Sequence, residues 1–386
     1  MRTALNSPLS RRRLLGLGAA TATAAILAAC GSSSSSVPTV SSGASGGATT
    51  APATRAPAGT VAPVASAAAA MTTGTTTGAT GATSAPAART GPTAPDLRLG
   101  YQPPYIGVAV MQQQKLLDDA FKGEKINIAY QRLLSPTPIY EALAGGSLDF
   151  GMGGPPIAAL ANGQPFQILA VIERSPKTHA LLVSPDSPIK TVADLKGKKI
   201  GSALGKAYAF PIRALQKAGL TDTDVQWLTI ENNEGRSALL SGGLDAWATW
   251  DPFYASVEAD KQVRKLVDGD PWYPNFVTLF TRADYASKYP DTVIRFMRAY
   301  NRALAYVRDN HADAVSIFAK ENMLKPEVAE LTVSRRNYQF APPGDDFLAD
   351  VTDQGKLFAR LGVTKSEPDW TKAINTTLAT AALSGV

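Results

Sequence analysis

The composition of the chain changes abruptly near residue 96, and this change limits what each part can fold into. Residues 31–95 are 65 residues long, and 58 of them are Ala, Thr, Ser, Gly or Pro. This segment has no aromatic residue, Leu, Ile or acidic residue, so it cannot bury enough apolar surface to offset the entropy of ordering. We expect a disordered tether with a reach of roughly 45 Å, as for a flexible coil. Globular folding is therefore expected for residues 96–386.

The charge of the chain is divided in the same way. The formal net charge is +6, with 38 Lys and Arg against 32 Asp and Glu. Residues 1–95 hold six Arg and no acidic residue, so residues 96–386 carry 32 basic and 32 acidic residues. A neutral body lacks the electrostatic footprint of a nucleic-acid-binding protein, so no nucleic-acid partner is expected. Its length is sufficient for one large domain or two lobes.

Residues 1–30 are typical of an export signal. Three arginines, Arg11–Arg13, precede an apolar run of 16 residues, Leu14–Ala29, which is short for a membrane span of about 20 residues. The run ends in Leu-Ala-Ala-Cys30, which resembles the bacterial lipobox, so Cys30 is expected to be diacylated and to become the new N-terminus. The alternative is an ordinary cleaved signal with an incidental thiol. The arginines also resemble a twin-arginine signal, with general secretion as the alternative.

Strand patterns alternate with helical patterns along the body, which predicts an α/β fold with a largely parallel sheet. Two segments 96 residues apart are alike, since Leu-Ala-Gly-Gly-Ser-Leu-Asp149 and Leu-Leu-Ser-Gly-Gly-Leu-Asp245 each join a helix end, a glycine cap and a buried strand. This similarity suggests two lobes of similar topology. After a strand at 276–281 the chain becomes helical, and a helical block that returns to the first lobe would make the domains discontinuous.

The chain has few residues suited to metal or nucleophilic chemistry. It contains one Cys and two His, His179 and His311, which nearly excludes a Cys/His zinc site, a disulfide framework and a Cys–His nucleophile pair. No Gly-x-Ser-x-Gly elbow and no phosphate-binding loop occurs in residues 96–386. We therefore expect no catalytic residue, no metal and no cofactor.

Three segments in order resemble the solute-binding proteins of ABC importers for sulfonates, taurine and nitrate, above all the aliphatic-sulfonate branch. They are Leu-Ala-Gly-Gly-Ser-Leu-Asp149-Phe-Gly, Ser-Pro-Ile-Lys-Thr-Val-Ala-Asp-Leu-Lys-Gly-Lys-Lys-Ile200 and Gly-Leu-Asp-Ala-Trp-Ala-Thr-Trp-Asp-Pro252, and the resemblance covers about residues 97–380. It implies a periplasmic-binding-protein-like fold of type 2, an α/β fold whose two lobes each have a mixed, mostly parallel sheet flanked by helices. Two crossing strands would join lobe 1, residues 96–183 plus 277–386, to lobe 2, residues 184–276.

The same resemblance implies a function. The protein would be a monomeric receptor, lipid-anchored to the outer face of the cytoplasmic membrane. It would capture a small organic anion between the lobes, close on it, and deliver it to an ABC permease and its ATPase. Two alternatives stay open, a solute sensor that signals to a membrane partner and an enzyme of related fold that makes a thiamine pyrimidine. That enzyme uses a site rich in His and Cys, and residues 96–386 contain no Cys.

Candidate ligand-binding residues follow the carboxyl ends of predicted strands, where open parallel sheets bind ligands. Two of these loops open helices, whose free N–H groups suit an anion. Lys206 would add positive charge, and Asp251 would meet a donor on the ligand or hold Lys206 in place. The candidates are Gln102, Tyr105, Gly153, Gly154, Pro155, Lys206, Ala207, Tyr208, Trp250 and Asp251.

Each candidate also has a structural interpretation. Lys206 can be a solvated loop residue, Asp251 can cap a turn, and the aromatic residues can serve packing. Arg236 is better explained as a surface charge, and His179 as a structural residue. The loop Gly-Lys-Ala-Tyr208 departs from the Ser-Ser-Ala-His of the sulfonate branch, which leaves the exact substrate open. The lysine still favours an anion, and the aromatic residues favour a ligand with an apolar or ring portion.

Overall fold

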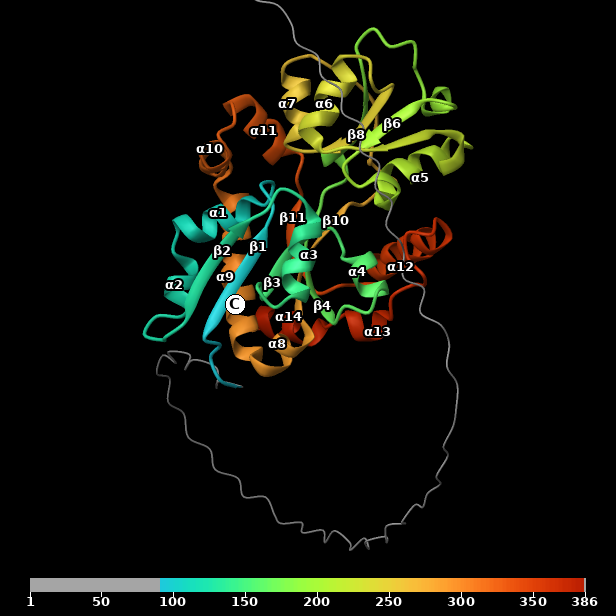
Figure 1. Ribbon diagram of the computed structural model, residues 1–386. Coiled ribbons are helices and arrows are strands. Elements are labelled where there is room, and N and C mark those ends of the chain that lie inside the picture. Colours follow the sequence, from blue (N-terminus) through green and yellow to red (C-terminus); the bar gives the residue numbers. More distant parts are fainter. Residues whose placement is uncertain (1–90, 385–386) are drawn as a thin grey trace, which may run out of the picture. The chain divides into compact units, whose positions relative to one another are not determined.

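A computed structural model describes residues 91–384 of the chain (Figure 1). The predicted export signal, Cys30 and most of the predicted tether lie outside the described residues. The packed body begins slightly before residue 96, because Ala94 is fully buried and its N–H donates to Thr292 Oγ1 over 3.0 Å. The Pro95 carbonyl likewise accepts a hydrogen bond from the N–H of Asn127, over 2.8 Å. The last residues of the predicted tether therefore belong to the body.

The first sheet has six strands in the order β11-β4-β10-β3-β1-β2. Strand β1 pairs in parallel with β2 and β3, whereas β10 runs antiparallel to β3 and β4, and β11 antiparallel to β4. All strands except β10 and β11 thus point the same way, which confirms a mixed sheet, although three of its five pairings are antiparallel. The strands are β1 (Asp96–Tyr101), β2 (Asn127–Arg132), β3 (Phe150–Gly153), β4 (Phe166–Arg174), β10 (Phe276–Arg282) and β11 (Tyr338–Ala341).

The second sheet has five strands in the order β7-β6-β8-β5-β9. Here β6 pairs in parallel with β7 and β8, and β5 runs antiparallel to β8 and β9. Its strands therefore repeat the topology of the first sheet, with β5 in the place of β10. They are β5 (His179–Val183), β6 (Lys199–Ser202), β7 (Gln226–Thr229), β8 (Ala246–Trp250) and β9 (Arg264–Asp268).

The two similar sequence segments occupy equivalent places in the two sheets. Asp149 accepts a hydrogen bond from the N–H of Arg98 on β1 over 3.0 Å, and Asp245 accepts one from the N–H of Lys199 on β6 over 2.8 Å. The aspartate N–H groups donate back to the same two residues, to Arg98 O and Lys199 O. Asp149 therefore holds the start of β3 against β1, and Asp245 holds the start of β8 against β6.

The leucine before each aspartate repeats this equivalence in the core. A Cβ added to Gly100 of β1 would lie 2.4 Å from Leu148 Cδ1, and one added to Gly201 of β6 would lie 2.4 Å from Leu244 Cδ1. Both glycines thus let a buried leucine approach the backbone of β1 or β6 closely. The repeated sequence segment encodes a repeated packing unit.

Helices flank both sheets. We call the first sheet with its flanking helices the first lobe, and the second sheet with α5, α6 and α7 the second lobe. The helices are α1 (Ile106–Gln113), α2 (Leu116–Ala120), α3 (Pro136–Ala144), α4 (Ile157–Ala161), α5 (Ala209–Lys217), α6 (Asn232–Leu240), α7 (Phe253–Ala259), α8 (Ala283–Lys288), α9 (Pro290–Asp309), α10 (His311–Asn322), α11 (Pro326–Ser334), α12 (Asp345–Arg360), α13 (Trp370–Ala373) and α14 (Thr376–Leu383). Within residues 91–384, none of them has both the length and the apolar character to cross a membrane.

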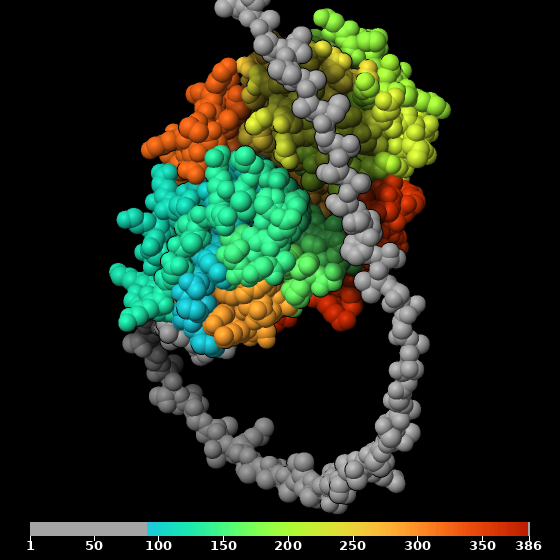
Figure 2. All heavy atoms as spheres, in the orientation of Figure 1, coloured from blue at the N-terminus to red at the C-terminus, as the bar shows by residue number. Residues whose placement is uncertain are grey.

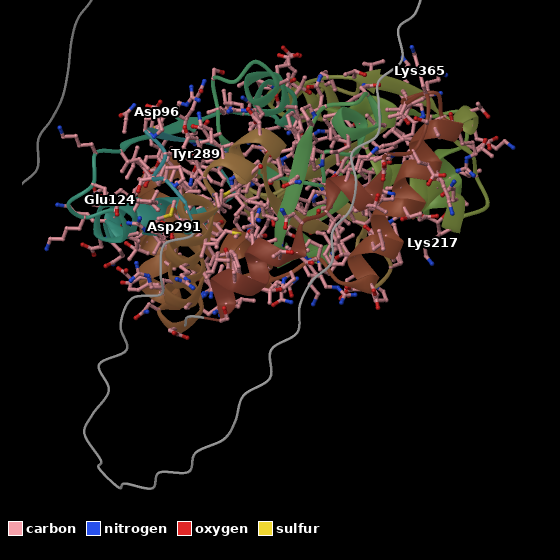
Figure 3. The ribbon with its side chains drawn as sticks, turned by 90° about the horizontal axis from the view of Figure 1, so that it is seen from below. Asp96, Glu124, Lys217, Tyr289, Asp291 and Lys365 are labelled. Carbon is pink, nitrogen blue, oxygen red and sulfur yellow. The ribbon has the colours of Figure 1, made fainter. Side chains whose placement is uncertain are left out.

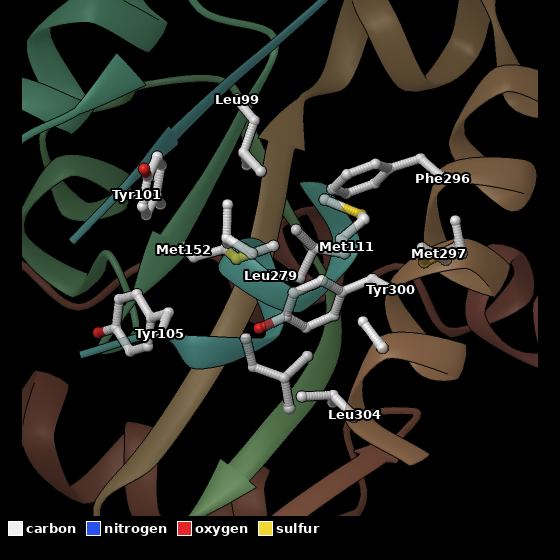
Figure 4. Packing of buried hydrophobic residues seen from close by; sticks show 14 of the residues in the cluster. Leu99, Tyr101, Tyr105, Met111, Met152, Leu279, Phe296, Met297, Tyr300 and Leu304 are labelled. Carbon is white, nitrogen blue, oxygen red and sulfur yellow. The ribbon is translucent and has the colours of Figure 1, made fainter. Parts of the chain in front are cut away.

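The core of the first lobe lies between its sheet and the helices α1 and α9 (Figure 4). Phe296 and Tyr300 of α9 are fully buried at helical spacing, as the apolar stripe of that segment predicts. They face Met152 of β3 and Leu279 of β10, which are also fully buried. This layer holds the parallel strands whose carboxyl ends carry several of the predicted ligand-binding residues.

Charged side chains of the body are either paired or at its periphery. Arg295 of α9 pairs with Glu124 over 2.7 Å and with Asp291 over 3.2 Å. Figure 3 shows these two carboxylates at one end of the body, while the exposed side chains of Lys217 and Lys365 project outward elsewhere. Many acidic residues are thus neutralised by a basic residue close by.

Two short connections join the sheets, one from β4 to β5 and one from β9 to β10. The Ser175 N–H donates to Asn275 O over 3.2 Å, and Asn275 Nδ2 donates to Ser175 O and to Thr178 Oγ1 over 3.1 and 2.9 Å. The first connection therefore lies at residues 175–178. Since β5 pairs within the second sheet, the structure places residues 179–183 there and not in lobe 1, where the sequence analysis put them.

The late helices, which belong to the residues expected in lobe 1, also contact the second lobe. Arg213 of α5 donates to Asp350 and Asp353 of α12, over 2.6 Å in each case. On the other side, Arg335 after α11 pairs with Glu258 of α7. Figure 2 shows the orange atoms of the α10–α11 region and the red atoms of α12 against the yellow and green atoms of the second lobe.

Candidate functional site

A cavity of about 350 Å³ lies between the two sheets, and residues of both lobes line it. One side comes from the loops after β1 and β3 and from α3, and the other from the loop after β6 and the end of β8. The two connections contribute Thr178, His179, Asn275 and Phe276. This volume is at the lower end of the range for small-molecule sites, about 300–1,000 Å³.

The structure brings most of the predicted ligand-binding residues to this one cavity. Because the central strands of both sheets end at it, residues far apart in the sequence meet there. The predicted residues that line the cavity are Gln102, Tyr105, Gly154, Pro155, Ala207, Tyr208 and Trp250. Gly153, Lys206 and Asp251 are not among the lining residues.

The contacts of Gly153 and Lys206 explain why these two residues do not line the cavity. Gly153 is the last residue of β3, and its carbonyl accepts a hydrogen bond from Thr278 Oγ1 of β10 over 3.1 Å. Lys206 directs its ammonium to Asp222, with Nζ and Oδ2 2.9 Å apart, and its side chain is 42% exposed. The position of Lys206 is thus that of a partly solvated loop residue.

Asp251 is fully buried behind the cavity and serves helix α7. Its Oδ1 accepts hydrogen bonds from the N–H of Ala255 over 2.9 Å and from Arg335 Nη1 over 3.2 Å. Burial raises the pKa of Asp251 to about 7, and the positive charge of Arg335 opposes this rise only in part. Arg236 forms a surface ion pair with Asp260 over 3.2 Å.

Arg336 is the single cation in the lining of the cavity among the described residues. It follows α11, its side chain is 4% exposed, and its Nη1 donates to Glu173 Oε2 over 2.6 Å. Burial acts to lower the pKa of Arg336, but the Glu173 carboxylate outweighs it and holds the pKa above its ordinary value. The guanidinium is therefore charged, and its Cζ lies 5.9 Å from the ring centre of Tyr105.

Several polar atoms around Arg336 are buried and have no hydrogen-bond partner within residues 91–384. They are Arg336 Nε, Glu173 Oε1, Asp251 Oδ2, Tyr300 Oη and Tyr338 Oη. An unsatisfied buried polar group costs about 1–3 kcal/mol, and such groups are rare in folded proteins. Their concentration around one guanidinium marks a buried polar cluster next to the cavity.

His179 lies in the lining and contacts a predicted site residue. Its Nδ1 lies 2.5 Å from Tyr208 Oη. Burial lowers the pKa of His179 to about 3, and the positive charge of Arg336 acts in the same direction. The imidazole is therefore neutral at physiological pH, and it holds the Tyr208 hydroxyl at the cavity wall. The structural role expected for His179 is consistent with this contact.

Sequence reasoning missed part of the lining. Arg336, Tyr140, Tyr273 and Phe358 are distant from the strand ends that the analysis used, and they enter from α3, from the connection after β9 and from the late helical block. The sequence offers one weak signal, the pair Arg335-Arg336 directly after an apolar helix. Nothing local distinguishes these two arginines, one of which lines the cavity while the other holds α7.

Neutral His179 should make folding sensitive to acid. At this imidazole only the unfolded chain takes up a proton near pH 6.5, because the folded-state pKa of His179 is about 3. The contribution of His179 to the stability therefore falls as the pH drops below 6.5. Between pH 7 and pH 5 this contribution to the free energy of unfolding should fall by about 1–2 kcal/mol. Contact of the ring with the cavity places the change at the lower end of that range. His179→Gln should lose that part of the pH dependence in denaturant titrations at the two pH values. Equal acid sensitivity in both proteins would show that His179 is protonated in the folded state.

Comparison with known proteins adds to this geometry. The family model described as NMT1/THI5 like matches residues 119–314. A relative from Escherichia coli (strain K12) is 34% identical over 227 residues, 58% of this chain and 70% of the relative, and its name provisionally describes an aliphatic sulfonates-binding protein.

Two solved structures are similar in fold and sequence. The periplasmic aliphatic sulphonate binding protein from Escherichia coli has a TM-score of 0.69 and 29% identity, covering 74% of this chain and 93% of that one. The alkanesulfonate-binding protein from Xanthomonas axonopodis pv. citri bound to MOPS has a TM-score of 0.69 and 27% identity, covering 74% of this chain and 100% of that one. These likenesses extend over both lobes, and the chain belongs to the NMT1/THI5-like family.

Proposed function

We propose that this chain is the extracytoplasmic solute-binding component of an ABC importer and that its cavity captures a small organic sulfonate. The observation that carries the proposal is a cavity between two lobes whose lining contains one cation among the described residues, Arg336. The similar proteins whose names refer to sulfonate binding support the same substrate class. The partners would be the permease and its ATPase.

The sulfonate head would bind beside Arg336. Gln102 supplies an amide at the same end of the lining, and its Oε1 accepts from Tyr105 Oη over 3.4 Å, which leaves Nε2 without a partner among residues 91–384. Ala209, the first residue of α5, also lines the cavity. The first N–H groups of a helix have no intrahelical acceptor and favour negative charge. These donors suit an anion with three oxygens, while the apolar walls suit its organic part.

The role of Arg336 can be tested without leaving the Glu173 carboxylate buried and unpaired. Arg336→Gln alone would isolate Glu173, so the comparison is between Glu173→Gln and the double variant Glu173→Gln/Arg336→Gln. Loss of a charged hydrogen bond costs about 1.5–3 kcal/mol, so the double variant should bind hexane-1-sulfonate about 10- to 100-fold more weakly than Glu173→Gln in titration calorimetry.

Lys206→Ala is the matched control for this experiment. Lys206 contacts Asp222 outside the lining, so its loss should change the affinity less than twofold. The anion-site assignment is wrong if the double variant binds within twofold of Glu173→Gln while circular dichroism shows that both are folded.

Lobe closure on the ligand is the second part of the proposal. The cavity has walls from both lobes, which two short connections and the contacts of α11 and α12 join. Hinge motion about such connections is a common way for a two-lobed protein to enclose a ligand. Small-angle scattering should therefore give a slightly smaller radius of gyration with saturating sulfonate. An unchanged profile at saturation would mean that the site does not close.

Membrane anchoring through Cys30 is the third part. Its support is the lipobox-like sequence before Cys30 and the Ala-, Thr- and Ser-rich segment that would separate a lipid from the body. The mature protein should begin at Cys30 and partition into detergent, and Cys30→Ala should shift it to the aqueous phase in Triton X-114 separation. Equal detergent partitioning of the variant would rule out this anchor.

A further inference from the structure

We propose that the organic part of the ligand is an aromatic ring, so that the cavity is a site for an arylsulfonate. This inference rests on the proposed function and narrows its substrate class. It comes from three features of the lining: rigid aromatic walls on both sides, the absence of an interior carboxylate among the described residues, and one fixed cation.

The wall from the second lobe is a set of rings that hold one another in place. Tyr208 and Trp250 meet edge to face, with centroids 5.6 Å apart and planes at 89°. His179 contacts both, at 5.4 and 6.2 Å, and its bond to Tyr208 Oη fixes the Tyr208 side chain. Since each ring is blocked by the next, this wall keeps its shape without a ligand and presents both faces and edges to the cavity.

The wall from the first lobe is also aromatic. Tyr140 of α3 donates through Oη to Gly154 O over 3.3 Å and packs on Phe280, with centroids 5.7 Å apart. Phe276, at the start of β10, is held edge to face by Phe347 at 5.4 Å. Tyr140 and Phe276 both line the cavity, so rings from two lobes border the same space.

Such walls favour a ring over an alkyl chain of equal carbon number. Aromatic pairs in stacked or edge-to-face geometry are stabilised beyond the area that they bury. A ring also enters the cavity without losing torsional freedom, whereas each rotatable bond of an alkyl chain is immobilised at a cost in entropy. Both effects act in the same direction, so an arylsulfonate should bind more tightly than an alkanesulfonate.

The charges of the lining disfavour a sulfonate that also carries an amine. Within the described residues the only carboxylate in the lining is Glu141, which is exposed on α3. Glu173 is paired with Arg336, and Asp251 lies outside the lining and is paired with Arg335. An ammonium group inside the cavity would therefore lose its hydration without gaining a carboxylate partner.

Titration calorimetry on the purified full chain with three sulfonates tests this inference. Benzenesulfonate and hexane-1-sulfonate have six carbons each, and taurine adds the amine. Benzenesulfonate should bind about 10-fold more tightly than hexane-1-sulfonate, and taurine should bind more weakly than either. If hexane-1-sulfonate binds as tightly as benzenesulfonate or more tightly, the aromatic inference is wrong and the proposed function stands. If none of the three binds, the proposed function fails and the inference with it.

Variants of the walls provide a second readout. Trp250→Leu, and independently Tyr140→Leu, should reduce the preference for benzenesulfonate over hexane-1-sulfonate to within about threefold, because each keeps apolar volume and removes a ring. Trp272→Leu is the matched control, since Trp272 stacks on Phe210 at 5.4 Å but does not line the cavity, and it should keep the preference. A preference that stays near 10-fold in both wall variants, each folded by circular dichroism, would overturn the role assigned to the walls.

Discussion

The ion pair between Glu173 and Arg336 joins the parts of the molecule that build the cavity. Glu173 lies near the end of β4, and Arg336 stands just before β11, the strand that pairs with β4. The Ser175 hydroxyl donates to Glu173 over 3.1 Å and accepts from the N–H of Asn337 over 3.0 Å, while the backbone of Ser175 bonds to Asn275 of the other connection. A buried ion pair contributes little net stability, because desolvation offsets most of the attraction. Its consequence here is positional: it fixes one cation at the point where both connections meet.

The repeated topology explains why a cavity forms at this point. In each sheet one strand, β1 or β6, lies between two parallel neighbours. An antiparallel strand, β10 or β5, then pairs with one of these neighbours. The carboxyl ends of the parallel strands end in loops, whose backbone groups are not used in the ladder. The two connections bring these loop-bearing edges to the same space. Asp149 and Asp245 secure the equivalent strands, so the same local chemistry builds both halves of the site.

The sequence predicts this architecture well and the site only in part, for a physical reason. Strand ends are local features, and the residues taken from them, such as Gln102 and Trp250, do line the cavity. The direction of a side chain depends on its neighbours, and Lys206 turns to Asp222, which lies 16 residues further along the chain. The main cation was missed because Arg336 reaches the cavity through pairing of β11 with β4, and its contact with Glu173 spans 163 residues. Contacts of that separation leave no periodic pattern in a single sequence.

The charge balance of the body determines whether an anion is attracted from a distance or only by contacts inside the cavity. Residues 96–386 carry equal numbers of acidic and basic residues, so no net charge concentrates anions from a distance. Recognition then depends on donors at short range, and Glu173 already occupies Nη1 of Arg336. An anion that joins a paired guanidinium gains less attraction than it would from a bare cation, yet the remaining N–H groups still fix its direction. This combination suits the proposed delivery of the ligand to a permease, because directed donors and shaped walls would select the ligand while the paired charge would let it leave.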